Sequence, residues 1–381
     1  MPEFDVSKKW AILVPPDATC INKAAGDLSR YLGLLAHRRG APKPAAASPA
    51  EAAPLVVDGT GDAPQCPIIV LNDGGGDSEK NGFSWRAGDE RVEIFGESGR
   101  GLCNGIYSFL SALGISWPFP GQEMLPSPVA AVPVGANHDP VNVNPGLPLI
   151  YGLANNRAYE SSRNKEVGSS LRRFFPAGKK TVKYILRNAE AFAAWAARRR
   201  YDAVIIPLSA FSSEKSRKKI RLFGKFAGEY GIALEAGGRE LSSLVPRKNY
   251  FLHRDYFRMA EGKRKREHHF CPTNPGSIKL VGREAEKIFR SAGEAKIFHL
   301  WPDRGAETIW CSCPSCRAFS PQEQNRIAVN TAADVLAPIN PSARISFYEQ
   351  SDEGVNIPLR KNLTRMERLP EEKELRNGGE N

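Results

Sequence analysis

Three cysteines, Cys311, Cys313 and Cys316, stand within six residues of one another. Their Cys-x-Cys-x-x-Cys spacing supplies three soft thiolates, and a tetrahedral zinc ion takes four ligands. Cys271 is the candidate fourth ligand, because one predicted strand ends at it and the next precedes the three-cysteine loop. Loops that follow neighbouring parallel strands lie at the same edge of a sheet. The pattern predicts a structural zinc site, and a metal-free cluster of reduced thiols or a redox site remains an alternative.

Three histidines, His268, His269 and His299, compete with Cys271 for the fourth position. The other cysteines, Cys20, Cys66 and Cys103, lie at strand and helix positions of the first part of the chain and are interpreted as buried thiols. The N-terminus lacks the basic start and long apolar run of a signal peptide. We therefore expect a cytoplasmic, reducing location, in which the seven cysteines are free or bound to metal.

Acidic side chains lie at or near the ends of several predicted strands, where barrel enzymes place their chemistry. The predicted catalytic residues are Asp303, Glu349 and Glu235. Glu235 precedes two glycines, which would let a ligand approach the backbone closely. Carboxyl groups in such places serve as general acids and bases. Each of the three could equally be a solvated loop acid or a hydrogen-bond acceptor of the fold.

Aromatic, amide and cationic side chains near the same strand ends are predicted to bind a substrate by stacking and by directed hydrogen bonds. They are Tyr151, Asn155, Arg157, Asn274 and Trp301. Packing or turn formation is the alternative role for each.

The first part of the chain, residues 1–130, is predicted to form a small α+β domain. Its expected elements are strand 10–15, helix 21–37, strand 66–73, hairpin 83–96 and helix 99–114. The Pro-rich stretch 131–146 is predicted to be a linker.

Strands and helices alternate through residues 147–355, which is typical of parallel βαβ units. The predicted strands are 148–153, 202–208, 231–238, 268–272, 296–303 and 344–350. No glycine-rich phosphate loop follows any of them, so a TIM-type (β/α) barrel is favoured over a doubly wound nucleotide-binding sheet. The expected fold class is therefore α/β, with a small α+β domain ahead of the barrel.

The barrel is expected to be incomplete. A closed barrel has eight strands, six are predicted, and residues 356–381 form a polar tail. An open barrel leaves two sheet edges with unpaired backbone groups. We therefore expect a homo-oligomer or a second chain that completes the barrel, and weak or no activity of the chain alone.

The net charge of +11 raises the question of a nucleic-acid partner. The basic runs, such as 263–267, have no interleaved aromatic residues of the kind found in single-strand stacking platforms, and no DNA-binding motif surrounds them. Solvated surfaces are the favoured interpretation, and nucleic acid is not an expected partner. No apolar run reaches the ~20 residues that span a membrane, so no membrane partner is expected either.

Several stretches resemble known families. The segment GRGLCNGIYSFLSALGISWPFPGQEMLP, residues 99–126, is similar to the end of the α+β domain that precedes the barrel in α-glucuronidases and hexosaminidases. The segments YGIALEAGG, FCPTNP, PDRG ahead of CSCPSC, and the helix with Asn330 resemble a glycosidase-like barrel domain of unknown function that occurs in bacterial proteins. The resemblance covers most of residues 1–355.

This resemblance implies work on a carbohydrate. Hydrolysis of a glycosidic bond uses one carboxyl group as acid and another as base or nucleophile, which are the roles expected of the three predicted acids. A glycan that contains uronic acid would suit a positive cleft formed with Arg157, Arg239 or Arg254. The competing hypothesis is a noncatalytic carbohydrate-binding or scaffold protein with a structural zinc site.

Overall fold

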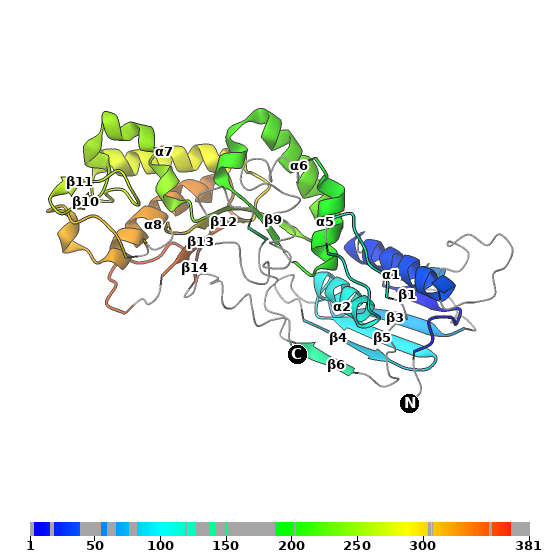
Figure 1. Cartoon of the computed structure of the whole chain (residues 1–381). Helices are drawn as coiled ribbons and strands as arrows, with labels where there is room; N and C mark the ends of the chain where they lie inside the picture. The colour runs from blue at the N-terminus through cyan, green and yellow to red at the C-terminus, as the bar shows by residue number, and fades with distance from the viewer. Residues whose placement is uncertain are drawn as a thin grey trace. The chain divides into compact units, whose positions relative to one another are not determined.

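A computed structural model describes most of the chain (Figure 1). The described residues are 4–15, 19–38, 55–58, 66–75, 82–118, 120–126, 137–141, 149–150, 187–201, 203–303, 306, 308–349 and 353–366. They fall into two compact units. Unit 1 comprises Met1–Pro148, Asn188–Ala203 and Lys225–Ile232, and unit 2 comprises Leu149–Arg187, Val204–Gly224 and Ala233–Asn381.

Unit 1 is built on a six-stranded mixed sheet. The strand order is β2 (Leu55–Asp58), β1 (Ala11–Val14), β3 (Ile68–Asp73), β5 (Arg91–Gly96), β4 (Phe83–Ala87) and β6 (Asn137–Val141). The first four strands run parallel, and β4 pairs antiparallel with both of its neighbours. The predicted hairpin 83–96 is thus present as β4 and β5.

Three helices of the described residues lie wholly within unit 1. They are α1 (Thr19–Arg38), α2 (Gly99–Ala112) and α5 (Ala189–Arg198). In Figure 1, α1 and α2 lie over one face of the sheet. The predicted apolar face of α1 is buried through Leu28, Leu32 and Leu35. Ser98 begins α2 by accepting a hydrogen bond from the Gly101 amide.

Unit 2 is built on a second six-stranded sheet. Its order is β14 (Leu363–Met366), β13 (Arg344–Tyr348), β12 (Ile297–Leu300), β9 (Ala233–Gly238), β8 (Ala203–Ile206) and β7 (Leu149–Ile150). The pairs β7–β8, β9–β12, β12–β13 and β13–β14 are parallel. The α/β class is therefore as expected, and the described strands do not close into a barrel.

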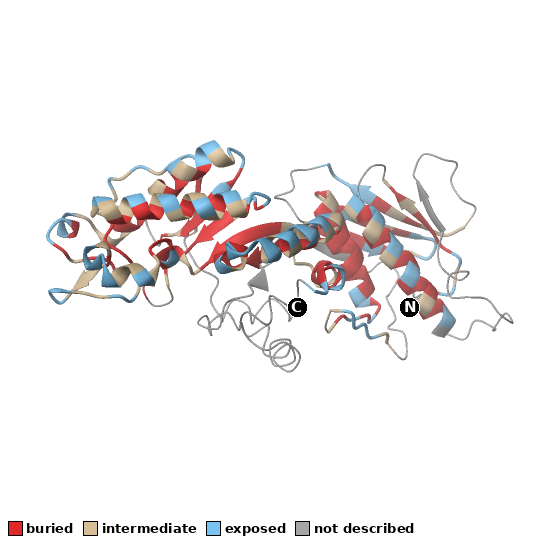
Figure 2. Ribbon diagram, turned by 90° about the horizontal axis from the view of Figure 1, so that it is seen from above, coloured by how far each residue is buried: buried red, intermediate tan, exposed pale blue. Residues whose placement is uncertain are grey.

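Helices and short turns connect the strands of unit 2. The described helices are α6 (Glu214–Glu229), whose end from Lys225 onward belongs to unit 1, α7 (Pro275–Ser291) and α8 (Pro321–Ile339). The 3-10 turns are η1 (Leu208–Ser212), η2 (Leu241–Leu244), η3 (Arg247–Phe251), η4 (Arg254–Tyr256) and η5 (Cys316–Ala318), and a hairpin pairs β10 (Met259–Ala260) with β11 (Lys263–Arg264). Buried residues lie along the strands and on one side of the helices (Figure 2). No described helix is long and apolar enough to cross a bilayer.

Several strand assignments differ from the sequence prediction: β2, β6, β10 and β11 were not expected, and β6 lies inside the predicted linker 131–146. Residues 268–272 form no strand, because His268 has a φ of 60°, which interrupts an extended backbone, and only Phe270 makes an isolated bridge, to Phe257. The sixth strand is instead β14, within the stretch expected to be a polar tail. The buried Leu363 attaches it to the sheet.

Candidate functional site

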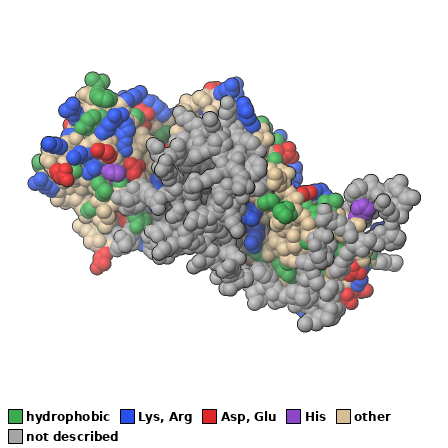
Figure 3. Space-filling model, in the orientation of Figure 1, with side chains coloured by type: hydrophobic (Ala, Val, Ile, Leu, Met, Phe, Trp, Pro, Cys, Tyr) green, Lys and Arg blue, Asp and Glu red, His purple; other side chains and the backbone are tan. Residues whose placement is uncertain are grey.

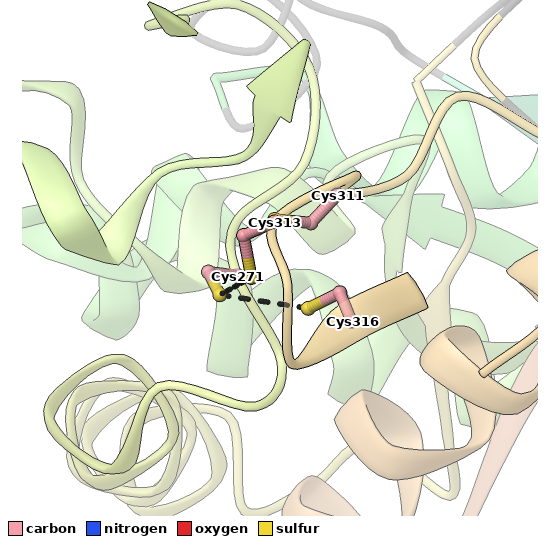
Figure 4. Close-up of side chains that lie close together, drawn as sticks. All are labelled: Cys271, Cys311, Cys313 and Cys316. Carbon is pink, nitrogen blue, oxygen red and sulfur yellow. Dashed lines mark hydrogen bonds between the residues drawn. The ribbon is translucent and has the colours of Figure 1, made fainter. Parts of the chain in front are cut away.

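The four cysteines of the predicted metal site form one buried cluster. The sulfur atoms of Cys271, Cys311, Cys313 and Cys316 all lie within 4.8 Å of one another (Figure 4). The sulfur of Cys271 lies 3.7 Å from that of Cys313 and 3.6 Å from that of Cys316. A tetrahedron with zinc–sulfur bonds of ~2.3 Å has sulfur–sulfur edges of roughly 3.8 Å. The cluster therefore has the size and the donor set to hold one metal ion.

Neighbouring polar groups hold the cysteine loops in place. The Met259 amide donates a hydrogen bond to the sulfur of Cys311 at 3.2 Å, and the Thr273 hydroxyl lies 3.0 Å from the sulfur of Cys316. From α8, the buried Gln324 accepts from the Cys311 amide and donates to the carbonyls of Cys311 and Cys316. No sequence pattern indicates this role, because a glutamine in a helix is common on any solvated face.

The four thiols lie too close together to ionise independently. Hydrogen bonds from Cys311 and Cys316 hold the pKa of Cys271 well below its usual range, and the hydrogen bond to Cys271 raises the pKa of Cys316 far above its own. Several thiolates share a small volume when a cation offsets their mutual repulsion.

A second polar cluster surrounds Asp303, three residues beyond the end of β12. The Ser242 hydroxyl donates a hydrogen bond of 2.7 Å to its carboxylate. The guanidinium of Arg247 lies 3.5 Å from the other oxygen, and the His268 ring nitrogen lies 4.0 Å away. His268 adopts the left-handed backbone region, which costs energy for a residue with a β-carbon and is often found at functional sites.

Backbone hydrogen bonds fasten the segment after β9 to the segment after β12. The Trp301 amide donates to the Gly238 carbonyl at 2.9 Å, and the Leu241 amide donates to the Trp301 carbonyl at 3.1 Å. Gly237 has a φ of 115°, and a β-carbon there would meet the His299 carbonyl at 2.1 Å. Glycine therefore permits the close approach that places the acids of both loops at one edge of the sheet.

Glu240 belongs to this edge and was not predicted. Its carboxylate accepts a hydrogen bond of 2.7 Å from the Leu208 amide at the start of η1. Burial, followed by the negative charge of Asp303, raises the pKa of Glu240 to about 7 against the opposing effect of backbone hydrogen bonds. A neutral carboxyl beside a second acid is a typical arrangement for a general acid. Sequence reasoning missed it because Glu240 follows the strand by two residues, in a loop rich in polar side chains.

The raised pKa predicts how stability varies with pH. The folded protein binds the Glu240 proton more tightly than the unfolded chain does, so this contribution is complete below about pH 4.5 and disappears as the pH rises through about 7. It is on the order of 3 kcal/mol. Glu240→Gln keeps a carbonyl acceptor and removes the titration. Urea unfolding at about pH 5 and about pH 8 should show a smaller loss of stability for the variant than for the wild type, and an equal loss would contradict the assignment.

Glu235 lies in a buried network on the strands themselves. Its carboxylate is 2.7 Å from the His299 Nε2 atom, and the His299 Nδ1 atom is 2.7 Å from the Ser346 hydroxyl. The Trp301 indole donates to the same hydroxyl at 2.8 Å. His299 and Ser346 are register partners on β12 and β13. This chain of hydrogen bonds can hold a proton on a defined atom. It also engages both ring nitrogens of His299, which is therefore not a ligand in the cysteine cluster.

Glu349 forms a buried ion pair with Arg326 of α8. Both of its oxygens accept from the guanidinium, at 2.8 Å each, and its side chain is fully buried. Arg326 also donates to the Ile357 carbonyl. Because both oxygens of Glu349 are engaged in this buried bidentate ion pair, its carboxylate serves the fold.

The predicted substrate-binding residues fall into two groups. Asn274 caps α7, since it accepts from the Ser277 amide and donates to Asp255. Trp301 is fully buried with Ile205, Tyr348 and Met366 around it. The remaining three, Tyr151, Asn155 and Arg157, lie outside the described residues.

Comparisons with known proteins give structural likeness without close sequence likeness. No family model and no curated protein sequence match the chain. A GH138 enzyme targeting pectin rhamnogalacturonan II is similar with a TM-score of 0.51 and 10% identity, over 93% of this chain and 47% of that one. The Flavobacterium johnsoniae chitobiase is similar with a TM-score of 0.47 and 15% identity, over 96% of this chain and 52% of that one. The Vibrio harveyi GH20 exo-β-N-acetylglucosaminidase is similar with a TM-score of 0.45 and 13% identity, over 94% of this chain and 54% of that one.

The chain thus spans about half the length of these structural neighbours. At such low identity the likeness concerns the fold alone, and the match to the GH138 enzyme, with a TM-score above 0.5, supports it. It agrees with the parallel strands and connecting helices of unit 2. The protein has a glycosidase-like α/β fold.

Proposed function

We propose that the protein is a glycoside hydrolase-like protein that acts on or binds a glycan at the edge of the unit 2 sheet where Asp303 lies. The observation that supports this most is that the loops after the neighbouring parallel strands β9 and β12 bring Glu240 and Asp303 near enough for the Asp303 charge to help raise the pKa of Glu240. Glycosidases use two carboxyl groups, and barrels carry them at this edge. Glu240 would supply a proton to the leaving oxygen. Ser242 and Arg247 would orient Asp303. Its carboxylate would then act either as the base that activates a water molecule or as the nucleophile that attacks the sugar.

The Asp303→Asn variant tests this function. We expect turnover of glycosides by the 381-residue chain to fall by roughly 10²- to 10⁴-fold, with folding unchanged, because the amide keeps the shape and the Ser242 hydrogen bond but cannot accept a proton. Asp334→Asn is the matched control. Asp334 is an exposed acid on α8 that pairs with Arg360, and its replacement should not alter turnover. A panel of aryl glycosides and oligosaccharides, with uronate-containing members, provides the assay. A loss of thermal stability in Asp303→Asn with no change in activity or binding would mean that Asp303 only supports the fold.

A noncatalytic carbohydrate-binding protein is the second candidate. The observation in its favour is that two of the predicted catalytic acids already have buried partners, His299 for Glu235 and Arg326 for Glu349. Saturable oligosaccharide binding without any turnover, weakened by Asp303→Asn, would select this candidate over the first.

We further propose that the four-cysteine cluster holds a structural zinc ion. The donor set consists of thiolates alone, the sulfur spacing suits a tetrahedral ion, and the cysteines are buried. Four protein ligands leave no open coordination position, which is the mark of a structural site. Its role would be to join the loop that carries His268 to the loop that follows Asp303.

A further inference from the structure

Residues 247–267, which we name the basic loop, form an unusual surface beside the cysteine cluster. The loop contains eight Lys and Arg residues against three acids. It also carries Phe251 and Leu252, whose exposures of 72% and 83% are the largest among the exposed large hydrophobic residues of the described chain. Figure 3 shows cationic side chains gathered around hydrophobic ones at the end of the molecule that carries β10 and β11. Exposed apolar groups framed by charge often mark a binding surface.

Basic and aromatic residues alternate in the first half of the loop, and the fold brings their side chains together. The Arg266 guanidinium lies 5.4 Å from the centre of the Phe251 ring, from the far end of the loop. The Arg254 guanidinium lies 5.7 Å from the centre of the Tyr250 ring. Each ring therefore has a guanidinium beside it that can form paired hydrogen bonds with a carboxylate.

The backbone beneath this surface is held firmly. The Tyr250 hydroxyl donates to the Arg264 carbonyl at 2.7 Å, and Arg264 donates to the Phe257 carbonyl at 2.7 Å. Arg264 and the Met259 amide both reach the sulfur of Cys311. The cysteine cluster thus anchors the loop, so a ligand would meet an ordered surface and binding would cost little conformational entropy.

The surface is continuous with the Asp303 edge. Arg247 begins the loop, donates to the Arg266 carbonyl and lies 3.5 Å from Asp303. A chain-like ligand that lies at Asp303 can therefore extend over the basic loop. A chain of sugars offers apolar ring faces to Phe251 and Tyr250, and a chain of uronates also offers a carboxylate to each guanidinium.

We propose that the basic loop is a binding surface for a uronate-bearing glycan chain, with Phe251 as the stacking platform and Arg254 and Arg266 as the carboxylate ligands. This inference rests on the proposed function. It adds that the glycan is negatively charged and that the part of the glycan beyond the Asp303 edge lies on the basic loop. It needs no turnover, so it is separable from the catalytic proposal.

Binding of polygalacturonate oligomers to the full 381-residue chain tests the proposal by calorimetry at low and moderate salt. The Arg254→Gln/Arg266→Gln variant should bind roughly tenfold or more weakly and with a smaller dependence on salt. The control variant, Lys215→Gln/Lys218→Gln, also removes two positive charges, but from exposed positions on α6, and it should leave binding unchanged. Methyl-esterified oligomers, which keep the sugar rings and lose the charge, should bind weakly to the wild type.

Phe251→Ser separates stacking from charge. It should weaken binding severalfold without changing the salt dependence, and its melting temperature should match the wild type because the ring is exposed. Equal losses in the basic-loop variant and the α6 variant would overturn the proposal in favour of a diffuse positive field. Tighter binding of single-stranded RNA, of sulfated glycans or of anionic phospholipid vesicles, dependent on the same residues, would also overturn it.

The two proposals fail differently. The Arg254→Gln/Arg266→Gln variant could lose uronate binding and still turn over small aryl glycosides normally. This result would support the proposal for the basic loop and would leave the proposal for Asp303 untouched. Turnover that depends on Asp303, together with polygalacturonate binding that does not depend on Phe251, Arg254 or Arg266, would overturn the surface alone.

Discussion

The Cys271→Ser variant is expected to lose its zinc and much of its stability. The purified wild-type chain should contain about one zinc ion, with sulfur neighbours at ~2.3 Å in X-ray absorption. Three remaining thiolates bind far more weakly than four, and the apo protein retains a cluster of thiols that no longer joins its two loops. We expect the melting temperature to fall by about 10 °C, and a strong chelator should produce the same fall in the wild type.

Cys66→Ser is the matched control, because Cys66 is a partly buried free thiol outside the cluster. It should keep both zinc and melting temperature. Wild-type protein that is metal-free after growth with zinc, and whose melting temperature ignores chelators, would show that the cluster is a set of packed thiols.

The second large effect is expected at the buried ion pair of Arg326 and Glu349. Arg326→Met leaves the Glu349 carboxylate fully buried without its partner, which should reduce the free energy of unfolding by about 3–5 kcal/mol. Replacing both residues, as Arg326→Met/Glu349→Leu, should recover much of this loss, because no charge then remains buried. Chemical denaturation measures both variants.

Arg360→Met serves as the control for this experiment, since its ion pair with Asp334 of α8 is exposed and should contribute nothing measurable. Glu349→Gln also tests the predicted catalytic role. If that variant unfolds like the wild type but loses glycoside turnover, Glu349 acts in catalysis and the ion pair is secondary.

The sequence predicted the α/β fold because period-two and period-3.6 apolar patterns are strong in its core elements. Strands β1, β3, β9, β12 and β13 all lie inside predicted ranges. The stretch 268–272 was misassigned because its apolar and aromatic letters suit a strand, whereas His268 turns the backbone at this point. Strand β14 was missed because four residues with one buried leucine give too short a pattern.

The site was predicted unevenly for a related reason. Cysteine is rare enough that spacing alone singled out Cys311, Cys313 and Cys316. Cys271 was added on the assumption of a strand that is absent, and it nevertheless lies with the other three. Carboxylates and amides are common, and only tertiary contacts separate their roles. Asn274 caps a helix, and Glu240 gains its raised pKa from burial beside Asp303, which no local pattern encodes.

The positions of the four cysteines also bear on how the protein is made. Cys271 precedes α7 and β12, and Cys316 follows them, so the two sulfurs are 45 residues apart in the chain and 3.6 Å apart in space. During synthesis the ligand set stays incomplete until Cys316 has left the ribosome, by which time the whole helix–strand unit between the cysteines has emerged. A metal ion held by all four sulfurs would therefore close a long loop of the chain that contains both α7 and β12.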